Sequence, residues 1–409
     1  MAQQTTPGLP HVAHPAANPA PTLPLMHAVF VLAGLGTMLL GPILPILAAN
    51  WHLRDSQSGL LLLAQFCGAT VGGATVSSRL GRDLFAGLAS AAAGFFVFAL
   101  APAFPLACAG LVVGGFGVGR TIASVNILAG QRATRQRGSA LSRLNFSWSL
   151  GALLSPLLAA WLVPHFALHT LLAAFAALFL SASAVLALQM RQGPAETAGE
   201  ASGSRENMPA SAESMPRIFI YFLLMLFLYG GLETCLSGWL TTYALRFGRT
   251  SLVLSEYTMV LLLAGLTAGR ALAARLLLKV QDTTLLRIAL MLTAMLTVGL
   301  VLAQRSSLIA TLAVLLGVCV APVFPASFSI YMSFRPPARQ AGLVLAASGI
   351  GAAALPWAMG VISTRSGSLR VALALPVSAA LAMLVQSRFG PGSRPHASQP
   401  APSRGINER

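Results

Sequence analysis

Apolar stretches of about 20 residues recur along the whole chain, separated by short segments that carry most of the charges. A helix needs about 20 residues, at about 1.5 Å each, to cross a bilayer. The pattern therefore predicts an all-α membrane protein with twelve transmembrane helices in two six-helix pseudo-symmetric bundles. The predicted spans are 27–49, 57–78, 84–101, 104–129, 140–163 and 167–190, then 217–244, 254–276, 283–303, 307–333, 340–362 and 369–387.

A polar segment interrupts the pattern between the sixth and seventh spans. It begins Gln192-Gly193-Pro194 and continues with Ala, Ser, Glu and Gly, a composition typical of linkers. Residues 73–82, after the second span, also resemble residues 269–279, at the matching place in the second half, as expected for a repeat. The predicted units are a disordered cytoplasmic tail (1–26), an N-terminal bundle (27–190), a cytoplasmic linker (191–216), a C-terminal bundle (217–388) and a cytoplasmic tail (389–409).

Composition agrees with a lipid environment. Hydrophobic residues make up 56% of the chain and charged residues 9%, with a mean hydropathy of +0.75. Soluble domains carry about 25% charged residues. The four cysteines lie inside apolar runs without paired spacing, so we expect neither disulfides nor a metal site there. His11 and His14 lie in a Pro-rich tail and are interpreted as solvated rather than metal-binding.

The net charge of +16 raises the question of nucleic acid binding. The basic residues are scattered between apolar runs and form no patch, so we expect no nucleic acid partner. If the N-terminus is inside, inner segments hold eighteen Lys and Arg and outer loops hold six. This asymmetry predicts that both termini are cytoplasmic. The first 25 residues lack Lys and Arg, so no signal peptide is expected, and the Arg- and Ala-rich composition suggests a bacterial inner membrane.

The segment after the second span resembles a signature of the major facilitator superfamily, Gly-x-x-x-Asp-Arg-x-Gly-Arg. Arg79, Gly81 and Arg82 match it, whereas Ser78 replaces the acid and Ala74 the first glycine. The resemblance implies that Arg79, Gly81 and Arg82 belong to a cytoplasmic gate. The missing acid is a departure from that pattern.

Four further segments resemble the branch of the superfamily that contains fucose–proton symporters. The resemblance implies alternating access of two bundles around a cavity lined by helices 1, 4, 7 and 10. In one departure, the first span carries no acid, and Arg120 stands near the place of the fourth-span acid. The matching segments are 115–119 with Asn126, 144–152 with Ser155-Pro156, 229–233 with 238–240, and 348–352 with 355–357.

Glu233 is the acid that lies deepest in a predicted span. It comes 16 residues after the start of span 217–244, near the middle of the bilayer. A buried carboxylate is costly unless it is paired, protonated or hydrated, and such acids usually line a transport pathway. Tyr229 and Ser237 share its helical face and are predicted to contact substrate. A structural Glu that ties helices together is the alternative.

Arg120 lies at a similar depth in span 104–129 and cannot realistically lose its proton. We predict that it binds substrate and pairs with Glu233 in one conformation, and that a proton or substrate breaks the pair. A permanent ion pair, or an Arg reaching the inner surface, are the alternatives.

Three further polar or aromatic residues are weighed in the same way. Asn126 is predicted to hydrogen-bond substrate or to cap a neighbouring helix. Trp239 is predicted to stack on a sugar ring or to anchor the outer interface. Arg270, near the inner end of span 254–276, is predicted to belong to the cytoplasmic gate or to reach the interface.

The sequence predicts a secondary active transporter of a small polar solute such as a sugar, with proton coupling through Glu233 left open. One alternative is proton-coupled efflux of an amphipathic or organic-anion compound, favoured by a partial match of Gly151 to Ala160 to an antiporter signature. Another is a non-transporting receptor or scaffold. No P-loop, hydrolase or dinucleotide motif is present, so neither an enzyme nor a cofactor is expected. The expected partners are a small-molecule substrate, protons and lipid, and the expected state is a monomer.

Overall fold

The computed structural model describes residues 21–53, 55–133, 136–192, 214–247 and 257–390, and every regular element among them is a helix. The first half contains α1 (Leu23–Met38), α2 (Leu40–Asn50), α3 (Asp55–Ala74), α4 (Leu80–Ala99), α5 (Phe104–Arg132), α6 (Arg137–Leu162) and α7 (Leu168–Gln192). The second half contains α8 (Ser214–Phe247), α10 (Thr258–Leu276), α11 (Asp282–Leu302), α12 (Ser306–Val320), α13 (Val323–Ser333), α14 (Ala338–Ser366), α15 (Leu369–Ala372) and α16 (Ala374–Arg388).

Each predicted span corresponds to one helix or to two consecutive helices. The first span is broken at Leu39, just before Gly41-Pro42, and the tenth is broken at Ala321-Pro322. Proline removes a backbone donor and clashes with the preceding turn, which accounts for breaks at these positions. Of the predicted tails and linker, residues 1–20, 193–213 and 391–409 lie outside the described residues.

Ten segments of the described chain are long and apolar enough to cross a membrane. Two spans fall short, α3 and α6. In α6 the hydropathy is lowered by Ser139, Ser142 and Asn145, which are nevertheless buried. Large apolar side chains face outward elsewhere: Leu180 is 61% exposed and Met295 64% exposed. A surface of this kind is suited to lipid, and polar groups concentrate inside, between helices.

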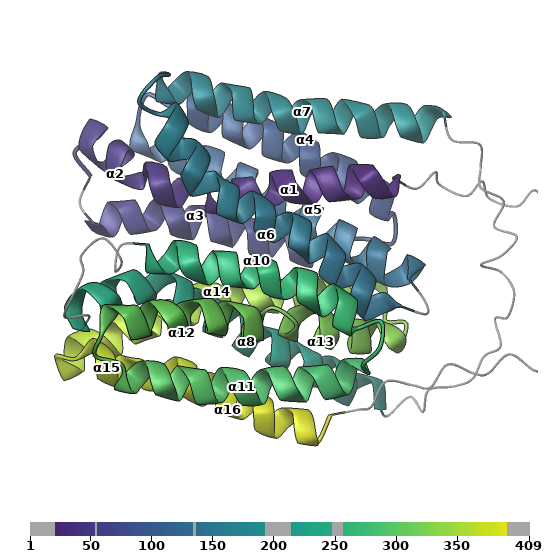
Figure 1. Ribbon diagram of the computed structural model, residues 1–409. Helices are drawn as coiled ribbons and strands as arrows, with labels where there is room; N and C mark the ends of the chain where they lie inside the picture. The colour runs from purple at the N-terminus through teal and green to yellow at the C-terminus, as the bar shows by residue number, and fades with distance from the viewer. Residues whose placement is uncertain (1–20, 54, 134–135, 193–213, 248–256, 391–409) are drawn as a thin grey trace, which may run out of the picture.

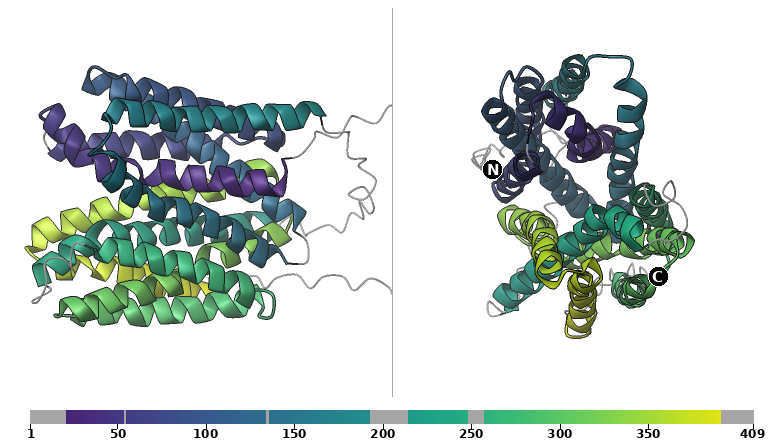
Figure 2. Two further views of the ribbon diagram at one scale, coloured as in Figure 1. Left: turned by 45° about the horizontal axis from the view of Figure 1, so that its top comes forward. Right: turned by 90° about the vertical axis from the view of Figure 1, so that its left-hand side faces the viewer.

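Helices α1 to α7 pack into one bundle and α8 to α16 into a second, as the end-on view in Figure 2 shows. The halves meet mainly where α6 packs on α10 and where α3 packs on α14, with further contacts from α5 and α13. We name the end of the molecule where α7 ends and α8 begins the linker end, and the opposite end the far end. Helix α1 begins and α16 ends at the linker end (Figure 1).

Glycines bring several helix pairs close together within each bundle. A Cβ added at Gly72 of α3 would lie 2.0 Å from the carbonyl oxygen of Phe116 in α5, and one at Gly119 would lie 2.0 Å from that of Ala69. A Cβ at Gly34 of α1 would lie 1.9 Å from the carbonyl oxygen of Trp148 in α6. These backbones therefore touch, which is a common way for membrane helices to associate.

Candidate functional site

A cavity of about 210 Å³ lies between the two bundles. Helices α1, α3, α5 and α6 form one side of it, and α8, α10, α12 and α14 form the other. Most of the wall is apolar or small, and among the described lining residues Glu233 alone carries a formal charge. The polar lining residues are Thr37, Gln65, Thr70, Trp148, Glu233, Thr234, Ser237 and Ser348.

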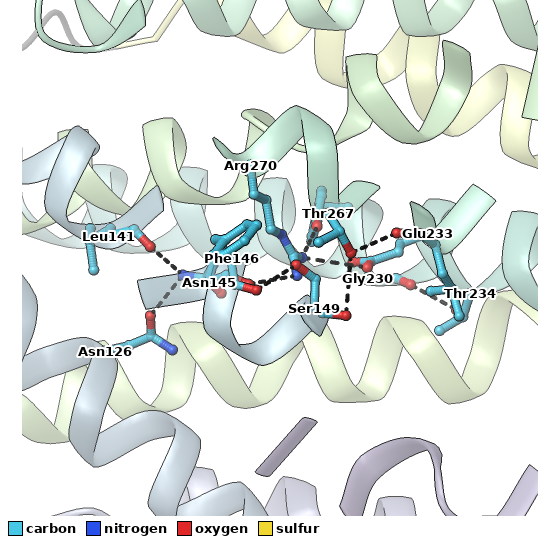
Figure 3. Close-up of polar contacts among 12 residues, drawn as sticks. Asn126, Leu141, Asn145, Phe146, Ser149, Gly230, Glu233, Thr234, Thr267 and Arg270 are labelled. Atoms are coloured by element: carbon cyan, nitrogen blue, oxygen red, sulfur yellow. Dashed lines mark hydrogen bonds and ion pairs between the residues drawn. The ribbon is translucent and has the colours of Figure 1, made fainter. Parts of the chain in front are cut away.

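Glu233 of α8 pairs with Arg270 of α10. The distance from Arg270 Nη2 to Glu233 Oε1 is 3.6 Å, and the two side chains are 3% and 20% exposed, respectively. The carboxylate therefore has access to the cavity, whereas the guanidinium is enclosed behind it (Figure 3). A permanently charged Arg in such a place requires a partner, and Glu233 supplies it.

Arg270 also reaches the other bundle. Its Nη1 donates to the carbonyl oxygen of Asn145 in α6 at 3.2 Å, and the guanidinium lies 5.0 Å from the centre of the Trp148 ring. Its Nη2 lies 3.5 Å from the hydroxyl oxygen of Tyr229. Arg270 thus links the charged group of the cavity wall to the interface between the bundles.

The chain of polar contacts continues away from the cavity. Asn145 Nδ2 donates to the carbonyl oxygen of Leu141 at 2.8 Å and to Asn126 Oδ1 at 3.3 Å. Asn126 is fully buried and donates to its own helix at Ile122. Asn126 therefore lies behind the cavity wall and contacts α6 through Asn145, inside that helix rather than at a helix end (Figure 3).

Hydrogen bonds join α6 of one bundle to α10 of the other, from beside the cavity toward the linker end. The hydroxyl of Ser142 donates to the carbonyl oxygen of Arg270 at 2.7 Å, and that of Ser139 donates to Ala274 at 2.7 Å. Thr267 contacts the carbonyl oxygen of Ser149 at 3.3 Å. We name this set of α6–α10 contacts the seam. In the described part of the chain, the bundles are thus closed against each other on the linker side of the cavity.

Arg120 and Glu233, which the sequence predicts to pair in one conformation, are not paired in this one. Its guanidinium pairs with Asp83 at the start of α4, and its Nη1 donates to Thr75 at 3.0 Å. Arg120 does not line the cavity. Its long side chain extends toward the linker end, where Asp83 lies. In this conformation Arg120 thus forms an ion pair outside the cavity, and its contact with substrate stays a prediction.

The contacts of Arg120 include an acid, Asp83, that lies close to the signature position occupied by Ser78. Asp83 follows Arg82 directly, is 4% exposed, and accepts from the amide of Ser77 at 2.7 Å and from its hydroxyl at 2.8 Å. The side chains of Arg79 and Arg82 are exposed, and Gly81 lies in the first turn of α4. An acid thus holds the turn between α3 and α4 from a position five residues after Ser78.

The remaining predicted site residues divide between wall and support. Ser237 lines the cavity, whereas Tyr229 is 2% exposed behind it. Trp239 donates from Nε1 to the carbonyl oxygen of Pro356 at 3.1 Å and joins α8 to α14 rather than facing the cavity. Arg270, predicted for the gate, contributes its backbone carbonyl to the seam and its side chain to the central pair.

Several cavity residues were not predicted. Gln65, Thr37, Thr70 and Ser348 contribute polar groups from α1, α3 and α14. Single polar residues within apolar spans were the available signal, with Gln65 the most distinctive because few glutamines occur inside the spans. Among the described residues, no group of three or more His, Cys, Asp or Glu side chains is placed to hold a metal ion.

Two six-helix bundles around a shared cavity define the fold class of secondary membrane carriers. The family model described as Major Facilitator Superfamily matches residues 26–341, and the chain belongs to this family. It is thus an integral, multi-pass membrane protein of a transporter family, not an enzyme. A search of curated proteins found no match.

Solved structures of transporters share the fold. A structure of FucP, a Major Facilitator Superfamily transporter, in the outward conformation has a TM-score of 0.71 and 16% identity over 90% of this chain and 97% of FucP. The human organic anion transporter MFSD10 has a TM-score of 0.68 and 16% identity over 89% and 98%. The proton:xylose symporter XylE has a TM-score of 0.67 and 15% identity over 90% and 95%.

Proposed function

We propose that the protein is a proton-coupled secondary transporter of a small solute and that Glu233 carries the coupled proton. The pairing of Glu233 with Arg270 is the observation on which the proposal rests. The pair joins the cavity wall to the seam, because Arg270 also donates to the backbone of Asn145 in the other bundle. The protonation state of one carboxyl is thereby tied to the contact between the bundles.

In the mechanism we propose, the deprotonated Glu233 holds Arg270 in place while the linker side is closed. Protonation of Glu233 removes the Coulomb attraction and leaves a buried cation without its counter-ion. A conformation that gives Arg270 another partner or water then becomes relatively more stable, which favours rearrangement at the seam. Substrate bound beside Glu233 would bias the same equilibrium.

The leading substrate class is a small polar solute such as a sugar. A cavity of about 210 Å³ has room for one small molecule, and six of its lining side chains bear hydroxyl groups or an amide: Thr37, Thr70, Thr234, Ser237, Ser348 and Gln65. The similar structures include a fucose:proton symporter from E. coli and a proton:xylose symporter. At 15–18% identity these likenesses support the fold, and the substrate remains part of our proposal.

Export of an amphipathic compound is the second candidate. The wall includes Met38, Phe66, Val118, Leu262 and Leu345, which suit an apolar surface better than a fully hydroxylated one. The organic-anion form of this candidate rested on Arg120, which pairs with Asp83 outside the cavity. We therefore retain export of an amphipathic compound as the second candidate. This site does not support export of an organic anion.

We further propose that the linker end faces the cytoplasm of a bacterial cell and that the protein acts as a monomer in its inner membrane. The orientation is supported by the eighteen Lys and Arg residues assigned to that side against six on the other. Extracellular modification of single cysteines at the far end, in a cysteine-free background, tests the orientation independently of transport.

Proton flux in proteoliposomes tests the proposal. Purified protein is reconstituted with the pH dye pyranine inside, and hexoses, pentoses, sugar acids and aromatic amines are added outside. The proposal expects substrate-dependent proton movement that Glu233→Gln abolishes. Glu206→Gln, which removes the same charge from the predicted linker, is the control and should retain the flux.

Proton movement that persists in Glu233→Gln would make Glu233 a structural residue. Solute counterflow without any proton movement in the wild type would indicate a uniporter. A chain that binds solutes but catalyses neither counterflow nor proton movement would be the receptor or scaffold alternative.

A further inference from the structure

The hydroxyl groups on the cavity wall are oriented by their own helices. Thr37 donates to the carbonyl oxygen of Ala33 at 2.8 Å, Thr70 to Phe66 at 2.9 Å, and Thr234 to Gly230 at 2.7 Å. Each hydroxyl has one hydrogen, and these bonds use it. The oxygen lone pairs are what the three threonines can still offer a molecule in the cavity.

Gln65 is oriented in the same sense. Its Nε2 donates to the carbonyl oxygen of Gly36 at 2.8 Å, and because a carbonyl can only accept, the amide nitrogen must face it. The Oε1 atom is then the part of the side chain available for a ligand. Helix α1 thus fixes the amide of α3 as an acceptor.

The two arginine side chains nearest the cavity, those of Arg270 and Arg120, do not line it. Arg270 is 3% exposed and is occupied by Glu233, Asn145 and Trp148. Arg120 is occupied by Asp83 and Thr75. The neutral groups that can donate are the hydroxyls of Ser237 and Ser348, which can also accept, and Trp148 Nε1, which has no hydrogen-bond partner among the described residues. Acceptors therefore outnumber donors on the wall.

We infer that the cavity selects small, uncharged or cationic solutes that have hydrogen-bond donors and one apolar face, and that it rejects anions. The acceptors are the Glu233 carboxylate, the Gln65 amide oxygen and the oxygens of Thr37, Thr70 and Thr234. An anion here would lose its hydration and meet no cationic group among the described lining residues, with only Trp148 Nε1, Ser237 and Ser348 as donors beside a carboxylate and four further acceptors, which is unfavourable. Hydroxyl and ammonium groups satisfy the wall. The inference rests on the proposed function, because it assumes that the cavity is the transport site. It does not depend on proton coupling.

Three probes that differ only in the head group test this selectivity: benzylamine, benzyl alcohol and benzoate. Binding to the purified full-length protein is measured from ligand-induced thermal stabilisation over a concentration series, which gives an apparent Kd for each probe. We expect the amine and the alcohol to bind at least about tenfold more tightly than benzoate. Benzoate binding equal to or tighter than that of the other two would overturn the inference.

Two variants make the test specific to the cavity. Glu233→Gln should weaken benzylamine at least about fivefold and leave benzyl alcohol within about twofold, because only the amine interacts with the full charge. Gln65→Lys places a cationic donor in the wall and should raise benzoate affinity above that of benzylamine. Unchanged amine binding in Glu233→Gln, or an unchanged order of probes in Gln65→Lys, would contradict the inference.

Failure of this inference can be told apart from failure of the proposed function. If benzoate is the preferred ligand but its transport moves protons in a Glu233-dependent manner, the selectivity is wrong and proton coupling stands. If amine and alcohol bind as expected but no solute moves protons, the selectivity stands and proton coupling is wrong.

Discussion

The pair of Glu233 and Arg270 gives a coupling energy that can be calculated and measured. At the observed 3.6 Å, Coulomb's law gives about 1 kcal/mol with the dielectric constant of water and about 5 kcal/mol with an effective value of about 20. Since Arg270 is enclosed and Glu233 is 20% exposed, we expect a coupling free energy of about 2–3 kcal/mol. The favourable sign means that the double variant loses less stability than the two single variants together.

A double-mutant cycle with Glu233→Gln and Arg270→Gln measures this energy from thermal unfolding in detergent. For a chain of this length, about 1 kcal/mol corresponds to about 1 °C in Tm. We expect each single variant to lower Tm and the double variant to recover about 2–3 °C relative to the sum. The matched control is the cycle of Glu233→Gln with Arg120→Gln, which should be additive because these side chains have different partners. Additivity in the first cycle, or coupling above about 1 kcal/mol in the control, would refute the assignment of partners.

Three further variants test the fold and the seam. Gly34→Ala should sharply reduce the yield of folded protein by size-exclusion chromatography, whereas Gly41→Ala, where an added Cβ meets nothing within 4 Å, should not; equal yields would contradict the tight α1–α6 packing. Ser139→Ala with Ser142→Ala removes two hydrogen bonds of the seam, worth about 1 kcal/mol each, and should raise cysteine labelling at the linker end about tenfold or more if the seam closes it. Asp83→Asn leaves Arg120 without its carboxylate and should cost about 2–3 kcal/mol by thermal unfolding, against less than about 0.5 kcal/mol for the exposed Arg275→Gln.

The helices were predictable because lipid imposes one strong rule on the sequence. Each span must be apolar over a fixed length, so the spans and the two-bundle fold follow from hydropathy and from the repeat. Breaks were harder to predict. Helices α1 and α2 separate near Pro42, whereas Pro156 and Pro356 lie within continuous helices. Each proline removes one backbone hydrogen-bond donor from its helix. Whether the helix then breaks depends on neighbouring groups that the local sequence does not reveal.

The sequence predicted where Glu233 lies along its helix but not which arginine it contacts in this structure. Helical rise placed Glu233 near the middle of its span, and the structure puts it on the cavity wall. The sequence placed Arg120 at the depth of Glu233 and Arg270 near the inner end of its span, and the packing of α8 beside α10 is what brings Arg270 to Glu233. Asp83 was missed as the acid of the turn because it lies outside the signature position, and its role depends on a bend that brings it back to Ser77.

The glycine contacts between α3 and α5 have a mechanical consequence. With backbones in contact at Gly68, Gly72, Gly115 and Gly119, these two helices have little room to slide, so they can act as one stiff lever. Helix α5 has 29 residues and a length of about 44 Å. A tilt of about 10° around its middle would displace each end by about 4 Å, more than the diameter of a water molecule. A small rearrangement at the level of Glu233 could thus be amplified into an opening at either membrane face.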